Sequence, residues 1–411
     1  MQLTLITKGS GIMVKKEMLA LGRHRSVIRE IFEYGCRRKA EIGADKVFDF
    51  SLGNPSIPAP PAVAETVKTL TDTVDPAVLH GYTSAAGDPA TRKAVADYIT
   101  RTFGFPADAG HVYMTAGAAA SLTATLTALV GAGDEVITLA PFFPEYTVFI
   151  GRTGAVMRPV MCREGDFGLD LAALAAAISE KTAAIIVNSP NNPTGAVPDE
   201  GDIKALSALL REKEKAFGHP IYLIADEPYR ELVYDGAEVP YIPAYYADTV
   251  VCYSFSKSLS LPGERIGYVF VPSCAADADA VFDAVCGAGR ALGFVCAPSL
   301  FQRVITACIG QTADIAVYDR NRKRLYAALC DMGFTVVPPR GAFYLFVKAP
   351  GGDAAAFCEL AKSEELLLVP SDDFYCAGYV RIAYCVTPEQ IENAIPAFRR
   401  LAKKCDLKEK A

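Results

Sequence analysis

Short apolar runs alternate with amphipathic segments through the middle of the chain. Six of these runs, which begin near residues 112, 134, 183, 221, 249 and 266, have the length and composition of strands. One of them, Thr182–Val187, is apolar at successive positions, as in a parallel strand that is buried on both faces. Segments with helical spacing of apolar residues, such as Pro89–Phe103 and Asp202–Phe217, separate the runs. The alternation predicts an α/β domain with a largely parallel sheet.

The pattern changes in the last third of the chain. A long charged helix is predicted at Asp314–Met332, and short strands at Phe343–Val347 and Tyr379–Ala383 precede a last helix at Pro388–Cys405. Near the other end, Glu17–Gly43 has helical spacing of apolar residues and predicts an N-terminal helix. We therefore expect a second, smaller α+β domain beside the α/β domain.

Composition narrows the classes of function. The chain has 411 residues, 51% of them hydrophobic, and a formal net charge of -6. This balance is compatible with a small-molecule enzyme and argues against a nucleic-acid-binding surface. No apolar run approaches the length of a membrane span and no secretory signal is evident, so we expect a cytoplasmic protein. The 12 cysteines and 4 histidines are dispersed without metal-ligand spacing, so no metal site is expected.

A polar segment that contains Lys257 lies between two apolar runs, Thr249–Tyr253 and Tyr268–Val271. Burial between core strands disfavours the ammonium form, so this lysine can become a neutral, nucleophilic amine. A neutral amine forms an imine with an aldehyde, which is how lysine anchors pyridoxal phosphate. The neighbouring hydroxyl groups and Arg265 suit the phosphate of such a cofactor. A solvent-facing lysine in a polar loop is the alternative interpretation.

Two charged side chains are predicted inside the core. Asp226 follows the apolar run Ile221–Ala225, and a carboxylate there needs a partner, such as the protonated ring nitrogen of pyridoxal phosphate. Capping of a following helix is the alternative for Asp226. Arg381 lies within the apolar strand Tyr379–Ala383 and needs an anion. A substrate carboxylate, bound by two parallel hydrogen bonds, or a structural Asp or Glu would supply it.

The segment around Gly117 joins a predicted strand to a predicted helix. Backbone N–H groups of Gly117, Ala118 and Ala119 would point at an anion there, and the small side chains would let a phosphate come close. Tight packing of the helix on the strand favours the same residues and is the alternative. Thr115 or Ser121 could add a hydroxyl group.

The lysine segment resembles the lysine signature of class I/II aminotransferases, which are fold-type I pyridoxal-phosphate enzymes. Ser254, Lys257, Arg265 and Gly267 keep the spacing of that signature, and Asn-Pro-Thr-Gly at residues 192–195 is close to a second motif of the family. The resemblance spans roughly residues 45–385. It implies a three-layer α/β fold, with a mainly parallel sheet in a large domain and a smaller α+β domain.

The resemblance also implies how the chain divides. Residues 58–298 would form the large cofactor-binding domain, and residues 299–411 the small C-terminal domain. The N-terminal segment, residues 1–57, would pack with the small domain. The small domain would therefore be discontinuous in sequence.

The family implies a role for each position that matches its motifs. Lys257 would anchor the cofactor and move the α-proton, Asp226 would keep the ring nitrogen protonated, and Tyr229 would bond the phenolic oxygen. The other implied cofactor contacts are Gly117, Ala118, Ala119, Ser254 and Arg265 at the phosphate, Asn192 at the phenolic oxygen, Phe143 on the ring, and Tyr82 at the phosphate of a partner subunit. Gly53, Asn192 and Arg381 would bind the substrate, Arg381 through its α-carboxylate.

Four of these positions also have simple structural explanations. Gly53 could end a strand in a turn, Tyr82 could face solvent in a loop, Phe143 could be a core aromatic residue, and Asn192 could belong to a plain Asn-Pro turn. Their functional roles rest on the resemblance.

The resemblance implies a homodimeric transaminase with shared active sites, which moves an amino group between an L-amino acid and a 2-oxo acid. Aspartate with 2-oxoglutarate is one candidate pair, since a second arginine would favour an acidic substrate and Arg290 and Arg340 are candidates by location. The same fold and residues also serve pyridoxal-phosphate β-lyases that cleave carbon–sulfur bonds. Pyridoxal-binding regulators without catalysis are a further alternative, but they usually carry a DNA-binding domain for which this chain has no spare length.

Overall fold

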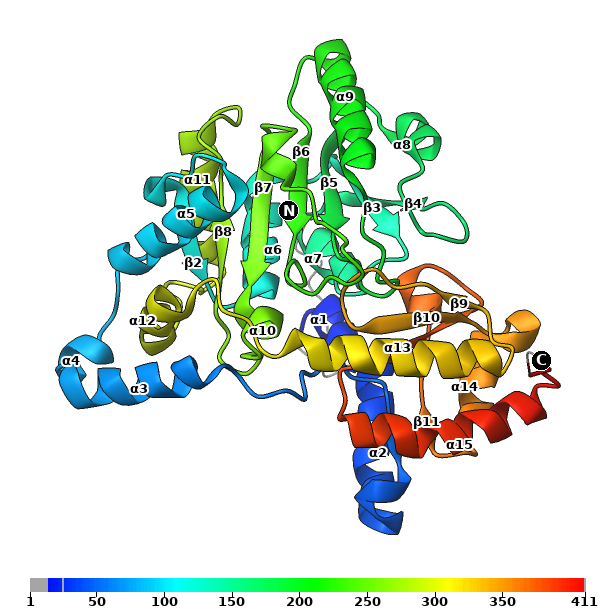
Figure 1. Ribbon diagram of the computed structural model, residues 1–411. Helices are drawn as coiled ribbons and strands as arrows, with labels where there is room; N and C mark the ends of the chain where they lie inside the picture. Colours follow the sequence, from blue (N-terminus) through cyan, green and yellow to red (C-terminus); the bar gives the residue numbers. More distant parts are fainter. Residues whose placement is uncertain (1–13, 24–25, 410–411) are drawn as a thin grey trace.

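The computed structural model describes residues 14–23 and 26–409, so the first 13 residues lie outside the description. The chain folds into a larger part around a seven-stranded sheet and a smaller part around a four-stranded sheet (Figure 1). Each part has its own apolar core. This architecture confirms the predicted α/β fold with a large, mainly parallel sheet and a smaller α+β domain.

The large sheet is parallel except for one strand. Its strand order is β2 (Val112–Thr115), β8 (Gly267–Phe270), β7 (Thr249–Ser254), β6 (Tyr222–Asp226), β5 (Thr182–Asn188), β3 (Glu135–Ala140) and β4 (Val156–Met161). Strand β8 runs antiparallel to both β2 and β7, and the other neighbouring strands are parallel. The carboxyl ends of β3, β5, β6 and β7 therefore share one edge, which is where open α/β sheets bind ligands.

Helices cover both faces of this sheet, because successive strand residues point to opposite sides. In β5, Ile185 belongs to the apolar cluster on one face and Ile186 to the cluster on the other. The first face carries α5 (Pro89–Phe103), α8 (Leu171–Ala177), α9 (Glu200–Phe217) and α12 (Ser299–Cys308), and the second carries α6 (Ala118–Leu129), α7 (Tyr146–Thr153) and α11 (Ala278–Ala291). Each buried aliphatic side chain contributes about 2 kcal/mol, so the two clusters hold the sheet between its helices.

Helix α5 has the bounds predicted from its pattern. The carboxylate of Asp88 accepts the N–H groups of Ala90 and Thr91 at 3.0 and 3.1 Å, and Pro89 occupies the first helical position. The helix ends at Gly104, whose φ of +63° lies in the left-handed region that glycine adopts without strain. Start and stop signals thus agree with the apolar spacing between them.

Edge strand β4 has no counterpart in the predicted elements. Its end residues Val156 and Met161 are 46% and 48% exposed, and it contains Arg158 and Pro159. Proline is tolerated on an edge strand because one side of that strand makes no ladder hydrogen bonds. An exposed strand of this kind has no continuous apolar run, so the hydrophobic pattern could not reveal it.

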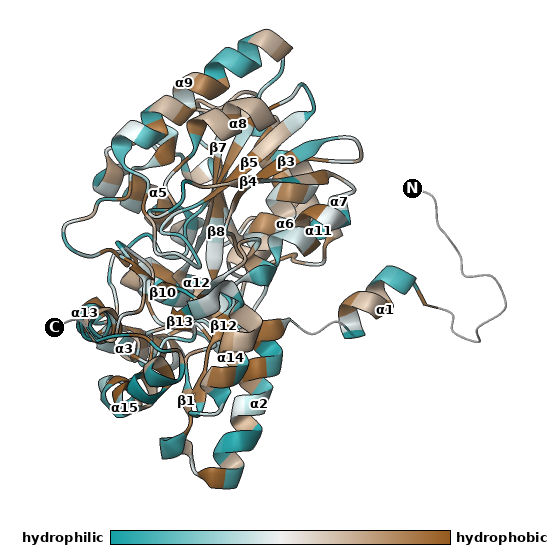
Figure 2. Cartoon of the chain, turned by 90° about the vertical axis from the view of Figure 1, so that its right-hand side faces the viewer, coloured by the Kyte–Doolittle hydropathy of each residue, from teal (hydrophilic) through white to brown (hydrophobic). Residues whose placement is uncertain are grey.

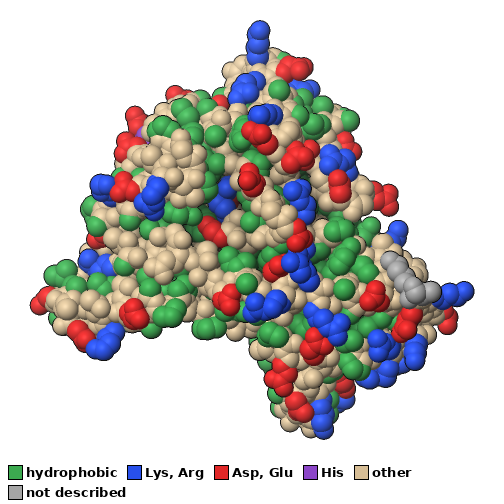
Figure 3. Space-filling model, in the orientation of Figure 1, with side chains coloured by type: hydrophobic (Ala, Val, Ile, Leu, Met, Phe, Trp, Pro, Cys, Tyr) green, Lys and Arg blue, Asp and Glu red, His purple; other side chains and the backbone are tan. Residues whose placement is uncertain are grey.

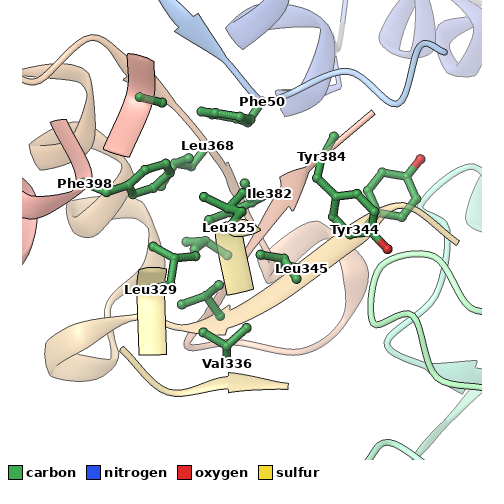
Figure 4. Close-up of a cluster of buried hydrophobic side chains, with 14 of the residues drawn as sticks. Phe50, Leu325, Leu329, Val336, Tyr344, Leu345, Leu368, Ile382, Tyr384 and Phe398 are labelled. Atoms are coloured by element: carbon green, nitrogen blue, oxygen red, sulfur yellow. The ribbon is translucent and has the colours of Figure 1, made fainter. Parts of the chain in front are cut away.

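The small domain is built on an antiparallel sheet with the order β12 (Val369–Pro370), β13 (Tyr379–Ala383), β10 (Tyr344–Lys348) and β9 (Val336–Val337). Helices α13 (Ile315–Asp331), α14 (Ala354–Lys362) and α15 (Pro388–Lys404) pack with it around one apolar cluster. Figure 4 shows this cluster, with the rings of Phe50 and Phe398 on one side and Tyr344 at its margin. The ring centres of Phe50 and Phe398 are 5.7 Å apart, so residues before the large domain contribute to the small-domain core.

The N-terminal segment contacts the small domain through a short strand and an ion pair. Strand β1 (Phe48–Asp49) pairs in parallel with β11 (Leu366–Leu367). Arg38 of α2 (Val27–Ile42) forms an ion pair of 2.6 Å with Glu365. Where one helix was predicted at 17–43, the structure has α1 (Lys16–Arg23) and α2; α1 has no buried residue and stands away from the body in Figure 2.

Helix α12 packs against α3 (Pro61–Thr73) and α5, both of which belong with the large sheet. The predicted domain boundary between residues 298 and 299 stays a prediction. The contacts of α12 favour a boundary on its C-terminal side.

The surface of the molecule carries mixed charge. On the face shown in Figure 3, lysine and arginine side chains are interspersed with aspartate and glutamate. Among the described residues, none of the helices combines the length and the apolar character needed to span a bilayer. No three His, Cys, Asp or Glu side chains within residues 14–23 and 26–409 are arranged to hold a metal ion.

Candidate active site

A cavity of about 290 Å³ lies at the carboxyl edge of the large sheet, against the small domain. Side chains at the ends of β5, β6 and β7 line it together with the first turn of α6 and residues of β10 and β13. The sequence-predicted residues that line this cavity are Gly53, Ala118, Ala119, Phe143, Asn192, Asp226, Tyr229, Ser254, Lys257, Arg265 and Arg381. The structure therefore brings together all the predicted site residues except Gly117, which adjoins the lining, and Tyr82.

Lys257 projects into the cavity from α10 (Phe255–Ser258), the single helical turn that follows β7. Its Nζ donates a hydrogen bond of 2.7 Å to the carbonyl oxygen of Gly53. Burial, assisted by the positive charges of Arg381 and Arg265, lowers the pKa of Lys257 to about 8. The amine is therefore partly neutral near that pH and can act as a nucleophile or a base.

Asp226 is the last residue of β6 and is buried. The hydroxyl group of Tyr146 and the side-chain amide of Asn188 donate to Oδ2, the amide at 3.2 Å. Oδ1 has no hydrogen-bond partner in the described part of the chain. Burial raises the pKa of Asp226 to about 7, against the hydrogen bond from Tyr146, which lowers it. A protonated ring nitrogen against Oδ1 would satisfy that atom and lower the pKa again.

The first turn of α6 forms a cradle for an anion. Gly117 precedes the helix with φ +84°, and no side chain caps the free N–H groups of that turn. A Cβ atom at Gly117 would lie 2.9 Å from Nη2 of Arg265, so glycine leaves room for this guanidinium group. Arg265 itself has φ +51°, a strained backbone conformation of the kind that clusters at functional sites. The N–H groups, the helix dipole and Arg265 together suit a phosphate.

The hydroxyl groups that could bind a phosphate form two pairs, one at the cavity and one outside it. Ser254 and Ser256 line the cavity, and their Oγ atoms are 2.7 Å apart. The hydroxyl groups of Thr115 and Ser121 are also 2.7 Å apart, but they lie between α6 and the sheet and neither residue lines the cavity. Ser254 is therefore available to a bound anion, whereas Thr115 and Ser121 join helix to strand.

Arg381 is 2% exposed, yet it has no carboxylate partner among residues 14–23 and 26–409. Its Nη1 donates to Oδ1 of Asn192 at 3.1 Å and its Nη2 to the carbonyl oxygen of Ser51 at 2.6 Å, while Nε has no partner there. The guanidinium carbon lies 4.5 Å from the ring centre of Tyr344 and 5.1 Å from that of Phe374. A buried, uncompensated guanidinium group that lines a cavity is suited to bind the carboxylate of a small molecule.

Tyr229 and Tyr344 form a buried hydroxyl pair, with their oxygen atoms 3.0 Å apart. Burial raises the pKa of Tyr229 well above its usual value, so the residue stays a phenol and can donate a hydrogen bond. A Cβ atom at Gly53 would overlap the hydroxyl group of Tyr344, which gives a steric reason for glycine there. Phe143 is half-buried at the cavity wall.

Tyr82, Arg290 and Arg340 lie away from the cavity of their own chain. Tyr82 is 99% exposed. Arg290 in the last turn of α11 and Arg340 are also exposed, and neither lines the cavity. Their roles at phosphate or substrate stay predictions, and the role predicted for Tyr82 is at the phosphate of a second subunit.

The side chains at the site that were not among the predicted residues include Asn188, Tyr146 and Tyr344. Asn188 belongs to the same polar segment as Asn192 at the end of β5, so the sequence could have predicted it as a residue of the site. Tyr146 follows a group of aromatic residues and Tyr344 sits in an apolar strand, and both patterns are typical of core residues.

The side chains and backbone groups of this cavity fit pyridoxal phosphate, because each of three groups can bind a different part of that molecule. Lys257 offers an amine for an aldehyde, Asp226 offers an unpartnered oxygen for a protonated ring nitrogen, and the uncapped start of α6 offers N–H groups for a phosphate. All three line or adjoin one cavity.

Comparisons with known proteins agree with this geometry. A sequence model described as "Aminotransferase class I and II" matches residues 45–398. A probable N-acetyl-LL-diaminopimelate aminotransferase of Bacillus subtilis is 30% identical over 89% of this chain and 92% of its own length. An aspartate aminotransferase of Pyrococcus horikoshii is 30% identical over 92% of this chain and 94% of its own length. The crystal structure of an amino transferase from Eubacterium rectale superposes with a TM-score of 0.93 at 53% identity, covering 96% of this chain and 99% of that one.

Proposed function

Because this chain belongs to the class I and II aminotransferase family, we propose that Lys257 anchors pyridoxal 5′-phosphate in the cavity described above. The chain is a transaminase, and the family in general depends on this cofactor. The observation that carries the proposal is that the low-pKa amine of Lys257 and the unpartnered oxygen of Asp226 line the same cavity.

Each residue of the cavity then has a defined task. When bound, pyridoxal phosphate supplies an electron-withdrawing ring that stabilises negative charge at the α-carbon of the amino acid. Lys257 Nζ takes the proton from that carbon, and Asp226 Oδ1 holds the proton on the ring nitrogen. Ser254, Arg265 and the amides of Gly117, Ala118 and Ala119 would hold the phosphate. Tyr229 and Asn192 would bond the phenolic oxygen, and Phe143 would contact the ring.

The substrates we propose are an L-amino acid and a 2-oxo acid. Arg381 orients the amino acid through its α-carboxylate, next to Gly53, because its buried guanidinium group lacks a carboxylate partner within the described residues. Aspartate and 2-oxoglutarate are the first pair to test, since relatives named aspartate aminotransferase match most of this chain.

We propose that the enzyme is a homodimer in which Tyr82 of one subunit completes the phosphate site of the other. Two features support this proposal: Tyr82 is 99% exposed, and it does not line the cavity of its own chain. A cytoplasmic location stays a prediction.

The test of the activity is an assay of the purified protein with aspartate and 2-oxoglutarate. Formation of oxaloacetate and glutamate in equal amounts is expected. Other amino acids are then screened under the same conditions. Release of pyruvate and ammonia from cystathionine would instead identify a carbon–sulfur lyase, and the absence of any product would favour a binding function.

Lys257→Ala tests the anchor. The variant should lose the visible absorbance band of the bound cofactor and at least about 100-fold in transamination rate, because both the covalent bond and the base are removed. Lys68→Ala is the control, since Lys68 pairs with Asp72 on the exposed face of α3. A Lys257→Ala variant that kept the band would contradict the assignment.

A further inference from the structure

Asn188 connects the two residues that would contact the ring of the cofactor. It is the last residue of β5 and lies in register with Asp226 of β6. Its Nδ2 lies 3.0 Å from the carbonyl oxygen of Asp226 and 3.2 Å from Oδ2 of the same residue. Its Oδ1 accepts the backbone N–H of Asn192 at 2.8 Å. One buried side-chain amide therefore bonds both Asp226 and the loop that carries Asn192.

These bonds fix which oxygen of Asp226 is free. Asn188 and Tyr146 both donate to Oδ2, and within the described residues nothing donates to Oδ1. A carboxylate that could rotate would exchange its two oxygens, and two donors on one oxygen oppose that exchange. Asp226 therefore lines the cavity with Oδ2 already hydrogen-bonded and Oδ1 free to accept a hydrogen bond from a ligand.

The side-chain oxygen of Asn188 acts on the loop that carries Asn192. The backbone of Asn192 is held by Asn188, and the side-chain oxygen of Asn192 accepts from Arg381 at 3.1 Å. A shift of Asn188 would therefore move Asp226, Asn192 and, through Asn192, the guanidinium group of Arg381.

We propose that Asn188 is a positioning residue that sets the orientation of the Asp226 carboxylate and the position of Asn192 as one unit. The inference rests on the proposed function and extends it to a residue of the cavity wall that acts through Asp226 and Asn192. Hydrogen bonds to a charged group contribute more free energy than those between neutral groups. Loss of the Asn188 amide should therefore weaken cofactor binding as well as lower the stability of the fold.

The test compares Asn188→Ala with Asn191→Ala. Asn191 lies three residues on in the same loop, and it bonds Pro141 and Thr194 instead of any residue of the cavity. The measurements are the dissociation constant of pyridoxal phosphate, the pH midpoint of the cofactor absorbance band, kcat and KM for the amino acid, and the melting temperature of the cofactor-free protein.

Asn188→Ala should weaken cofactor binding by about 10- to 100-fold, shift the pH midpoint of the band and lower kcat more than it changes KM. Asn191→Ala should change the melting temperature alone. Equal effects of the two variants on affinity and midpoint, or an effect of Asn188→Ala on melting temperature alone, would overturn the proposal.

Asn188→Asp provides a second variant of nearly the same volume, in case the alanine variant does not fold. It replaces the amide donor of Asn188 by a carboxylate next to the carboxylate of Asp226. This change should move the pH midpoint of the cofactor absorbance band further than the alanine substitution does. An unchanged midpoint in Asn188→Asp would also overturn the proposal. The wild-type protein, assayed separately for transamination, shows whether a failure belongs to this inference or to the proposed function.

Discussion

Burial moves the pKa values of Lys257 and Asp226 in opposite directions, because it disfavours the charged form of each. The amine therefore tends toward its neutral form and the carboxyl toward its protonated form. A ligand that takes the amine into a covalent bond and brings positive charge to the carboxylate would suit both groups at once. Each shift can be measured separately.

For Lys257, we expect covalent attachment of pyridoxal phosphate to the cofactor-free protein to accelerate with pH around a midpoint near 8. Only the neutral amine attacks the aldehyde, and a lowered pKa makes this form available at lower pH. Stopped-flow absorbance between roughly pH 6 and 10 measures the midpoint. A midpoint close to that of an ordinary lysine, above about 10, would show that the amine is not desolvated.

For Asp226, we expect cofactor-free wild-type protein to lose stability between about pH 4 and pH 7, relative to Asp226→Asn. A carboxyl group with a raised pKa binds its proton more tightly in the folded state, so its contribution is present at low pH and is lost as the pH rises. The difference is on the order of 4 kcal/mol across this range.

Chemical denaturation of both proteins at several pH values measures this difference. Asp226→Asn should be the more stable cofactor-free protein at neutral pH and the poorer enzyme. Parallel stability curves for the two proteins would contradict the raised pKa. Added pyridoxal phosphate should narrow the gap, because a cation at Oδ1 favours the ionised carboxylate.

How far the sequence predicted the site depended on the chemistry of each residue. Lys257, Asp226 and Arg381 were found because a charge inside an apolar run needs an explanation. Tyr344 was not found, because a tyrosine in an apolar strand is ordinary. Its contact with Tyr229 forms only after the two domains are brought together, whereas Arg381 lies on the neighbouring strand β13 of the same sheet.

At the scale of the elements, the geometry at the start of α6 depends on a single residue, Gly117. Gly117 has φ +84°, and a Cβ atom there would lie 2.9 Å from Arg265. We expect Gly117→Ala to weaken binding of pyridoxal phosphate by about 10-fold or more, because a strained conformation of this kind costs about 1–3 kcal/mol and the guanidinium group must move. Equilibrium titration of the cofactor measures the change.

Gly131→Ala is the matched control, since a Cβ atom at Gly131 would meet nothing within 4 Å and the residue lies just beyond the other end of α6. This variant should bind the cofactor as the wild type does. Equal losses in both variants would mean that the cradle at Gly117 plays no special part.

Elements were predicted well where burial made the pattern strong. Helix α5 and the buried strands of the large sheet follow their apolar runs closely, because both faces of that sheet are covered. Strand β4 was not predicted because it is an exposed edge, and strands β11 and β12 are separated by one residue yet belong to different sheets. Short strands that pair with different partners cannot be divided from composition alone.

At the scale of the whole molecule, shared active sites can be tested by mixing two inactive variants. Lys257→Ala lacks the anchor, and Tyr82→Ala should lack a phosphate contact in the site of its partner. Mixed dimers of the two would contain one site with both wild-type residues, so activity should exceed that of either variant alone. Dimers formed by refolding the variants together would be assayed against the same variants refolded separately.

No recovery of activity on mixing, with dimers confirmed by sedimentation, would place Tyr82 outside the partner's site. A monomer at assay concentration with full activity would contradict the homodimer itself. The sequence offered no physical signal for this arrangement, because an exposed loop tyrosine looks the same whether it meets water or a second chain.

The pairing of β1 with β11 joins residues 48–49 to residues 366–367. The carbonyl oxygen of Ser51, beside this pair, accepts from Arg381. On the ribosome, residues 48–49 can therefore form this pair only after residues 366–367 have been translated. The large sheet, whose strands all lie between residues 112 and 270, can form in the meantime. In nascent chains, the cofactor-binding residues of the large sheet should therefore become ordered before Arg381 is positioned to bind the amino acid. Cofactor binding to ribosome-bound chains of increasing length would show this order.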